Sequence, residues 1–381
     1  MSHCPWTYRA LAISGDDFLP CCRFQGNFVI ENNDLNASYK NGKISEFRRR
    51  LDNGEKLQEC NDCWFNEKIG VKSMRQQGLD MWGEVRTPEI QFVELDLDNT
   101  CNLKCVSCNS RQSSSLVAEE IKLYGKQVFA ERKITDHFKQ LDFSKLKIVK
   151  LIGGEPFLSK KITDACQHIL EKRIENDLEL WINTNCTVLP NDTVQELIMN
   201  CRQLHLNLSI DGYKDLNNFV RNDTVWEDLV SNLKRFNEYI NQRGNKSTFI
   251  SINFVVHLYN ANKIHELQTW IKHNFPKFNI EITALVTPKF LSLVHAPADY
   301  KIYLENYFRT HNLNNLIPFL KESNQNLFDY FYAYHHLLVD LRQKDINDSN
   351  PELFEYIKQY VPTRHMSKDE VFSLRTFESG L

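Results

Sequence analysis

Strand-like and helix-like stretches alternate through the middle of this 381-residue chain. The strand-like stretches are short, apolar and rich in β-branched residues, and they cover 91–97, 145–152, 178–185, 204–210, 248–257 and 279–286. Helical patterns fall between them, over 113–126, 159–172, 191–200, 224–240 and 261–273. Strands joined through helices pair in parallel, with right-handed crossovers. The pattern therefore predicts an α/β fold with a (β/α)6 partial TIM barrel, open where a full (β/α)8 barrel would close.

Four distinctive loops follow strands of this predicted barrel. They are 101–108, 153–156, 184–186 and 209–212. Parallel barrels place their chemistry at the C-terminal ends of the strands. The sequence therefore predicts an active site at that end.

The first of these loops holds three cysteines, Cys101, Cys105 and Cys108. Three thiolates cannot complete a four-coordinate structural zinc site, and nothing nearby in the sequence offers a fourth ligand. They can hold three irons of a [4Fe–4S] cluster and leave the fourth iron open, where ordinary ferredoxin clusters use four cysteines. The alternatives are a zinc site or three unrelated buried cysteines.

The CxxxCxxC motif, followed one strand later by Gly-Gly-Glu-Pro at 153–156, resembles the radical S-adenosylmethionine (SAM) enzymes. The resemblance implies a barrel of the radical SAM type and an open iron that chelates SAM. It also implies reductive cleavage of SAM to a 5′-deoxyadenosyl radical, which abstracts hydrogen from a substrate, and an electron donor such as flavodoxin or ferredoxin. One position departs from the family: Ser107 stands where an aromatic residue usually packs near adenine.

The same resemblance assigns residues to SAM. Gly153 and Gly154 let backbone approach the ligand, and Glu155 accepts hydrogen bonds from the SAM ammonium. Asn185 corresponds to a polar family position near SAM. A strand-end cap is the alternative for Asn185.

Two further positions, Ser209 and Arg221, resemble residues that contact the SAM carboxylate, a task that suits the permanently charged fork of arginine. Structural roles in a strand end or an ion pair are the alternatives. Cys186 stands where the family commonly has glycine. Its thiol is either a hydrogen-atom donor to a substrate radical or a small buried packing group.

The first 85 residues contain five more cysteines: Cys4, Cys21, Cys22, Cys60 and Cys63. A hairpin and a CxxC motif together supply four thiolates, which either zinc or an iron–sulfur cluster accepts. The order of cysteine, glycine turn, Pro-Cys, helix and CxxC is similar to the twitch and SPASM domains, in the N-terminal arrangement. That resemblance implies an auxiliary [4Fe–4S] cluster on Cys4, Cys21, Cys60 and Cys63.

Adjacent strand residues point to opposite faces, so only one of Cys21 and Cys22 is expected to be a ligand. The Pro-Cys resemblance favours Cys21. Around this site, residues 4–8 and 11–21 are expected to form two strands, 27–45 a polar loop, 44–57 a helix and 60–77 another helix.

We expect three units: 1–85 as the auxiliary cluster domain, 86–290 as the barrel and 291–381 as a helical extension. In the last of these, an apolar stripe at helical spacing predicts a packed helix. The stripe comprises Phe328, Phe331, Tyr332, His335, Leu338 and Val339. A further helix is expected over 352–360.

Net charge, hydropathy and cysteine content limit the classes of protein to which this chain can belong. The net charge of −3 argues against a generally basic nucleic-acid binder, although Arg48-Arg49-Arg50 is a local basic run. No apolar run approaches membrane-spanning length and no signal peptide is seen, which predicts a cytoplasmic protein. There its 11 cysteines stay reduced and are better interpreted as metal ligands than as disulfides.

The leading hypothesis is an enzyme that modifies a peptide or protein by radical chemistry, because twitch and SPASM clusters often accompany peptide substrates. The rival hypothesis is modification of a nucleotide, nucleobase or tRNA. A non-enzymatic iron–sulfur or zinc-binding protein is the third.

Overall fold

The computed structural model describes residues 2–127, 133–172, 177–321 and 327–371. Its main sheet has nine strands in the order β11-β10-β8-β7-β6-β4-β1-β2-β3. Six of them are the predicted barrel strands: β4 (Phe92–Asp96), β6 (Ile148–Ile152), β7 (Glu179–Thr184), β8 (Gln203–Ser209), β10 (Ser247–Val256) and β11 (Asn279–Ala284). All six pair in parallel, which confirms the predicted α/β partial barrel.

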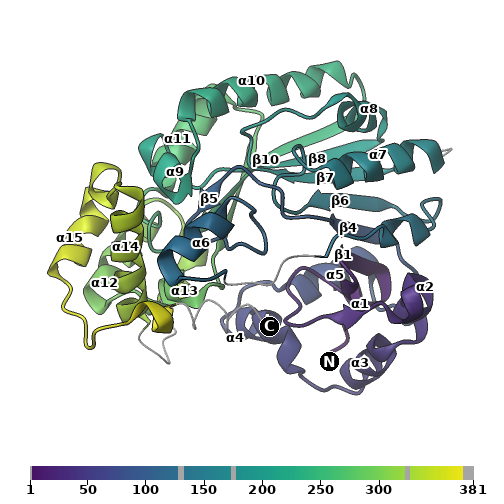
Figure 1. The fold of residues 1–381 in the computed structure, drawn as a ribbon, viewed down its shortest axis with the longest axis horizontal. Coiled ribbons are helices and arrows are strands. Elements are labelled where there is room, and N and C mark those ends of the chain that lie inside the picture. The colour runs from purple at the N-terminus through teal and green to yellow at the C-terminus, as the bar shows by residue number, and fades with distance from the viewer. Residues whose placement is uncertain (1, 128–132, 173–176, 322–326, 372–381) are drawn as a thin grey trace.

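The helices between these strands cover one face of the sheet (Figure 1). Among them are α7 (Lys160–Lys172), α8 (Asp192–Asn200), α10 (Trp226–Gln242) and α11 (Ile264–Asn274). Side chains alternate along each strand, so Leu180 and Ile182 of β7 are fully buried while Trp181 and Asn183 are only partly buried. The aliphatic face and the helices form the core, and the opposite face keeps polar side chains.

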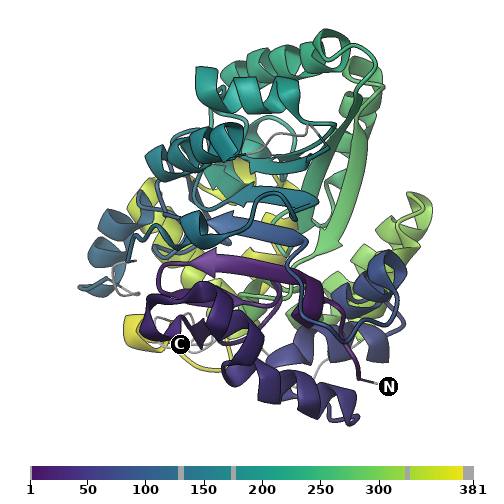
Figure 2. The same cartoon turned by 90° about the vertical axis from the view of Figure 1, so that its right-hand side faces the viewer.

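The N-terminal segment extends this sheet. Strand β1 (Ala10–Ser14) pairs in parallel with β4, and Figure 2 shows the two strands side by side. Strands β2 (Asp17–Leu19) and β3 (Phe28–Val29) continue it as an antiparallel meander. The predicted hairpin after residue 11 is therefore present, but the first predicted strand is wrong. The chain forms the short helix α1 (Trp6–Arg9), because Pro5 before it already has helical backbone angles.

Two other N-terminal expectations need correction. The segment expected to be a polar loop contains helix α2 (Leu35–Asn41), whose first turn is capped by the Asp34 side chain. The single helix expected over 60–77 is broken into α4 (Asn61–Lys68) and α5 (Met74–Trp82), with Gly70 at φ 76° between them. Helix α3 (Lys43–Asp52) overlaps the predicted helix 44–57, starting one residue earlier and ending five residues sooner.

The C-terminal extension is helical, as predicted. It contains α12 (Ala298–Thr310), α13 (Ile317–Lys321), α14 (Phe328–Arg342) and α15 (Pro351–Gln359), which gather beside the sheet in Figure 1. On α14 the predicted stripe faces the core, with Phe328, Phe331, His335 and Leu338 buried. No helix among the described residues is long and apolar enough to cross a membrane.

Candidate active site

The loop after β4 carries Cys101, Cys105 and Cys108, and its backbone is fixed at both ends. The short strand β5 (Lys104–Cys105) pairs antiparallel with β9 (Arg221–Asn222), which places Cys105 opposite Arg221. All three cysteines are partly exposed. The loop therefore presents three thiols from a defined backbone at the C-terminal end of the sheet.

Serine side chains just before helix α6 (Leu116–Tyr124) hold the same loop from behind. The Ser113 hydroxyl donates to the Leu103 carbonyl at 2.6 Å, and the Ser115 hydroxyl donates to the Cys101 carbonyl at 2.7 Å. These bonds satisfy carbonyls that the loop would otherwise leave unpaired. The serine run after the last cysteine is thus part of the local structure that shapes the motif.

Glu155 of the Gly-Gly-Glu-Pro motif is fully buried and bonded within the protein. Its carboxylate accepts the Thr184 hydroxyl at 2.8 Å and the Asn185 backbone N–H at 2.7 Å. It also accepts the Phe157 N–H at 3.1 Å. Burial raises the pKa of this carboxyl group to about 7, although the three donors act in the opposite direction. The structure thus places Glu155 where it ties the end of β6 to the end of β7.

The two glycines before Glu155 are required by a close approach of two loops. A Cβ atom at Gly154 would lie 2.3 Å from the Thr100 carbonyl oxygen, and one at Gly153, whose φ is 125°, would lie 2.7 Å from the Asp98 carbonyl oxygen. Side chains at either position would push the β6 loop away from the cysteine loop. The glycines therefore bring the two SAM-motif loops into contact.

Asn185 joins the third strand end to the cysteine loop. Its side-chain amide donates to the Asn102 side chain at 3.0 Å and to the Cys101 sulfur at 3.8 Å. An N–H that points at a thiolate stabilises the charged sulfur and is one of the contacts that tune a cluster. The structure brings together Cys101 and Asn185, which are 84 residues apart.

Arg221 faces the cysteine loop from β9. Its guanidinium pairs with Asp211 at 2.7 Å, and the side chains are 14% and 4% exposed. Burial raises the pKa of Cys105 to about 11, and the positive charge of Arg221 acts against that rise. Within the described residues the buried Nε of Arg221 has no hydrogen-bond partner. The sequence did not single out Asp211 as a functional residue, although it directly follows the β8 motif.

Ser209 and Cys186 lie together below this site. Cys186 is fully buried, and its thiol contacts the Thr184 carbonyl at 3.6 Å and the Ser209 backbone. Its φ of 66° lies in the left-handed region that glycine adopts most easily. Burial therefore holds the thiol protonated, with its pKa well above the ordinary value.

The residues at this end fit a cluster and SAM. Three thiols lie on one loop, an arginine with an unused N–H lies beside Cys105, and an amide points at Cys101. In the described part of the chain, no three metal-binding side chains are placed closely enough to hold a single ion. In a cubane cluster each thiolate binds a different iron, so the sulfurs stand farther apart than around one ion.

The N-terminal cysteines form a second group. Cys4 precedes α1, Cys21 follows β2, and Cys60 and Cys63 lie at the start of α4. The thiols lie near enough to act on one another's ionisation: Cys63 raises the pKa of Cys4, and Cys4 raises those of Cys21 and Cys60. Burial is the largest cause in each case, and it raises the pKa of Cys4 to about 12.

Cys22 differs from these four cysteines in being exposed. The charges of Glu94, Lys150 and Arg23 act on its thiol, and Cys22 in turn raises the pKa of the adjacent Cys21. That only one of Cys21 and Cys22 is a ligand stays a prediction.

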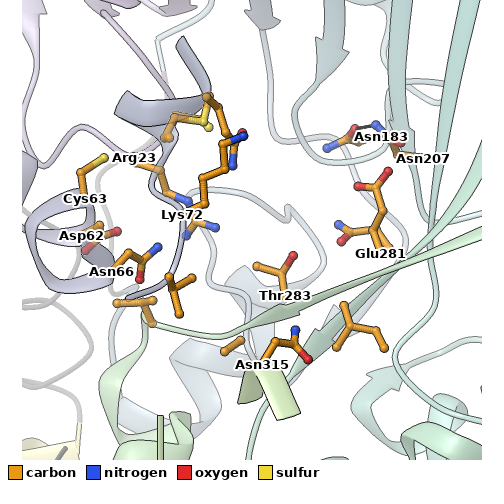
Figure 3. A pocket seen from close by; sticks show the side chains of 18 of the residues that line it. Arg23, Asp62, Cys63, Asn66, Lys72, Asn183, Asn207, Glu281, Thr283 and Asn315 are labelled. Carbon is orange, nitrogen blue, oxygen red and sulfur yellow. Dashed lines mark hydrogen bonds between the residues drawn. The ribbon is translucent and has the colours of Figure 1, made fainter. Parts of the chain in front are cut away.

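A cavity of about 460 Å³ separates the N-terminal segment from the polar face of the sheet (Figure 3). One wall carries Cys63, Asp62 and Arg23. The facing wall carries side chains from successive strands, namely Asn183, Asn207, Asn253, Glu281 and Thr283. These polar positions alternate with buried aliphatic residues along each strand, and that alternation is the sequence signal that could have revealed the cavity.

Residues 97–271 match the family model of the radical SAM superfamily. This part of the chain is a radical SAM domain. The match includes the three loop cysteines, Gly153 to Glu155, Asn185 and Arg221. The match supports an enzyme that uses SAM, and the family implies a [4Fe–4S] cluster. The same match argues against the non-enzymatic hypothesis.

Two solved structures resemble this chain at low similarity. One is anSMEcpe with bound AdoMet and the Cp18Cys peptide, at 18% identity and a TM-score of 0.39 over 67% of this chain and 66% of that chain. Another is Streptococcus suis SuiB bound to S-adenosylmethionine, at 17% identity and a TM-score of 0.39 over 73% of this chain and 59% of that chain. The match thus spans less than two thirds of either protein. The sequence matches no curated protein significantly.

Proposed function

We propose that this radical SAM enzyme modifies a peptide or protein substrate held in the cavity between its N-terminal segment and the barrel. The observation that carries the proposal is the pair of facing polar walls. Amide side chains of Asn183, Asn207 and Asn253 line one wall, and Asn207 donates to Asn183 at 3.0 Å. Amide groups both donate and accept, which suits an extended peptide backbone.

The roles of the barrel residues follow from their positions. Cys101, Cys105 and Cys108 hold the cluster, with one iron left open. Asn185 and Arg221 steady the thiolates, and the unused Nε of Arg221 is available to the SAM carboxylate. Gly153 and Gly154 bring the β6 loop against the cysteine loop, and Glu155 fixes the end of β7. Ser209 borders the same space.

The cluster held by Cys101, Cys105 and Cys108 would supply one electron, taken from a ferredoxin or flavodoxin, for the reductive cleavage of SAM. The products would be methionine and a 5′-deoxyadenosyl radical, which would take one hydrogen atom from the substrate. Each turnover therefore uses one electron and leaves a substrate radical. If that radical is oxidised to the product, the leftover electron needs an acceptor.

The four N-terminal thiols supply such an acceptor in our proposal. We propose that Cys4, Cys21, Cys60 and Cys63 hold a second [4Fe–4S] cluster with every coordination position closed. Cys63 lines the cavity, so this cluster would lie beside the substrate. We also propose that the protein works in the reducing cytoplasm, because there the thiols stay available as ligands.

Modification of a nucleotide or tRNA finds little support in the charge distribution. Each arginine of the basic run 48–50 already has a partner within the chain. Arg48 is 3% exposed and donates to the Thr7 and Tyr39 carbonyls, Arg49 pairs with Glu46, and Arg50 pairs with Glu55. A phosphate backbone would need several unpaired surface cations.

Deuterium transfer distinguishes the two substrate classes. The probes are perdeuterated synthetic copies of short peptides encoded beside the gene, and perdeuterated total tRNA. We expect deuterium to enter 5′-deoxyadenosine from a peptide and not from tRNA. Transfer from tRNA alone would overturn the peptide assignment and leave the radical chemistry intact.

A further inference from the structure

Helix α14, far from the cysteine motif in sequence, makes direct contact with its backbone. The Tyr334 hydroxyl donates to the Val106 carbonyl at 2.9 Å, and the Arg342 guanidinium donates to the Lys104 carbonyl at 2.8 Å. Lys104 and Val106 are the residues on either side of Cys105. One helix therefore holds the peptide groups that flank the middle cysteine.

Arg342 is also half of a buried ion pair with α6. Its Nε lies 3.0 Å and its terminal nitrogen 2.6 Å from the two carboxylate oxygens of Glu119. The side chains are 6% and 7% exposed. A bidentate pair of this kind fixes both orientation and distance, and loss of either partner leaves an uncompensated buried charge.

These contacts connect three elements: the cysteine loop, α6 and α14. The cysteine loop lies between α6, which holds Glu119, and α14, which holds Arg342 and Tyr334. On its other side, the loop pairs with β9 and the Arg221–Asp211 pair. Two arginines, Arg221 and Arg342, therefore lie beside the backbone around Cys105, and each is paired with its own acidic partner.

A positive charge beside a cluster favours the reduced form, because reduction adds negative charge. Net charge, hydrogen bonds and burial are the features that set the potential of an iron–sulfur cluster. Arg342 supplies both a hydrogen bond next to Cys105 and a charge, whereas Glu119 supplies the opposite charge. The two residues of one pair should therefore act on the potential with opposite signs.

We propose that Tyr334 and Arg342 are positioning residues for the radical SAM cluster, and that the Arg342–Glu119 pair sets its reduction potential. The C-terminal extension is then a working part of the active site. The proposal rests on the cysteine loop holding a cluster.

The test is a reductive titration of the full-length reconstituted enzyme. The titration measures the midpoint potential of the cluster, and it is monitored through the EPR signal that changes when SAM is added. We expect Glu119→Gln, which leaves Arg342 unopposed, to raise the midpoint potential. Arg342→Gln should lower it, Arg342→Lys should keep it near the wild-type value, and the Glu119→Gln/Arg342→Gln double variant should fall between the single variants. Shifts of the same sign in Glu119→Gln and Arg342→Gln would overturn the proposal, because a purely structural role predicts that result.

The positioning role has its own readout, the rate at which a chelator removes iron from the oxidised protein. Tyr334→Phe removes one hydroxyl without changing the packing volume, so we expect about fivefold faster iron loss and an unchanged potential, the effect of one neutral hydrogen bond. Tyr300→Phe is the matched control, since Tyr300 is a buried tyrosine of α12 that bonds to Asn262.

Arg243→Gln is the second control, because Arg243 is buried and donates to the Cys201 carbonyl, away from the cysteine loop. Both controls should leave the iron-loss rate and the potential unchanged. Equal effects in the controls and in the α14 variants would contradict the positioning role. A protein that binds no SAM-responsive iron at all would instead contradict the proposed function.

Discussion

The barrel cysteines and the N-terminal cysteines bind metal, in our account, through opposite designs. The barrel group lies on one continuous loop of eight residues, 101–108, which neighbouring elements hold from several sides. The N-terminal group is assembled from three separate places: before α1, after β2 and at the start of α4. The first design leaves a coordination position open for a ligand, and the second closes all four.

Their surroundings differ in the same sense. The barrel thiols are partly exposed, and polar groups surround them, including Arg221 and Asn185. Three of the four N-terminal thiols, Cys4, Cys21 and Cys60, pack in an apolar cluster with Trp6, Phe24 and Leu57. A site that must admit SAM needs charged partners, whereas a closed electron-transfer site can lie among apolar groups. The contrast teaches that the neighbouring groups, more than the cysteine count, separate the two roles.

The largest expected effect comes from removing the N-terminal cluster alone, which tests whether the two cysteine groups hold separate clusters. In Cys60→Ala/Cys63→Ala we expect iron content to fall from about eight to about four per chain, because a cubane needs its thiolates. SAM cleavage without substrate should persist. The control is Cys166→Ala, a buried cysteine of α7 that should keep all the iron. One zinc and no iron at the N-terminal site, after anaerobic purification, would contradict the account.

Single substitutions test which of the adjacent residues Cys21 and Cys22 is the cluster ligand. Cys21→Ser should lose the N-terminal cluster, since Cys21 lies within the four-thiol group. Cys22→Ser should keep it, because Cys22 is exposed toward Glu94 and Lys150. Iron and sulfide analysis of the two variants checks this directly. Loss of iron in Cys22→Ser with retention in Cys21→Ser would reverse the assignment.

Within the barrel site, Glu155 predicts a pH dependence. Burial raises its pKa to about 7 in the folded protein, so the folded state binds the proton more tightly than the unfolded chain does. The free energy of unfolding of the apoprotein should therefore fall as pH rises from about 4.5 to about 7, by at most about 3 kcal/mol for this group. Above that range this group should add no further change.

Urea denaturation at pH 5.5 and pH 8 measures the effect. Glu155→Gln should remove this part of the pH dependence, and Glu227→Gln, at an exposed position of α10, should retain it. An identical pH dependence in wild type and Glu155→Gln would show that the buried carboxyl group does not titrate as described.

The smallest expected effect is at Cys186. Its left-handed backbone costs about 1 kcal/mol relative to glycine, while the buried thiol contributes a similar amount through packing. Cys186→Gly should therefore change the free energy of unfolding by less than about 1 kcal/mol. Cys186→Val, with a branched side chain in the same conformation, should cost more than about 2 kcal/mol. Equal losses in both variants would contradict this balance.

The sequence predicted those parts of the molecule that are coded locally. The six barrel strands follow from short apolar stretches, some with alternating burial as in β7 and one buried throughout, β4. The three-cysteine loop follows from its spacing after β4. The sequence could not predict contacts between distant segments. Examples are the pairing of β1 with β4, the bond from Tyr334 to Val106 across 228 residues, and the burial of Glu155 under Thr184. Sequence patterns within one segment do not identify the distant residues that the segment will contact.

The mistaken prediction for the N-terminal segment also results from contacts between distant segments. Residues 4–8 are predicted to be a strand, but residues 6–9 form one helical turn in which Trp6 is buried against Trp82 and Phe92. Tertiary packing overrides local preference most easily in short segments. Gly78 shows the same constraint, because a Cβ there would lie 2.6 Å from the Trp6 ring.

The central claim is that the 101–108 loop holds the cluster that cleaves SAM. The direct measurement is 5′-deoxyadenosine formation by the anaerobically reconstituted, dithionite-reduced protein and by Cys101→Ala/Cys105→Ala/Cys108→Ala. We predict product from the wild type and none from the triple variant, which should still retain about four irons at the N-terminal site. Wild-type amounts of 5′-deoxyadenosine from the triple variant would contradict the account.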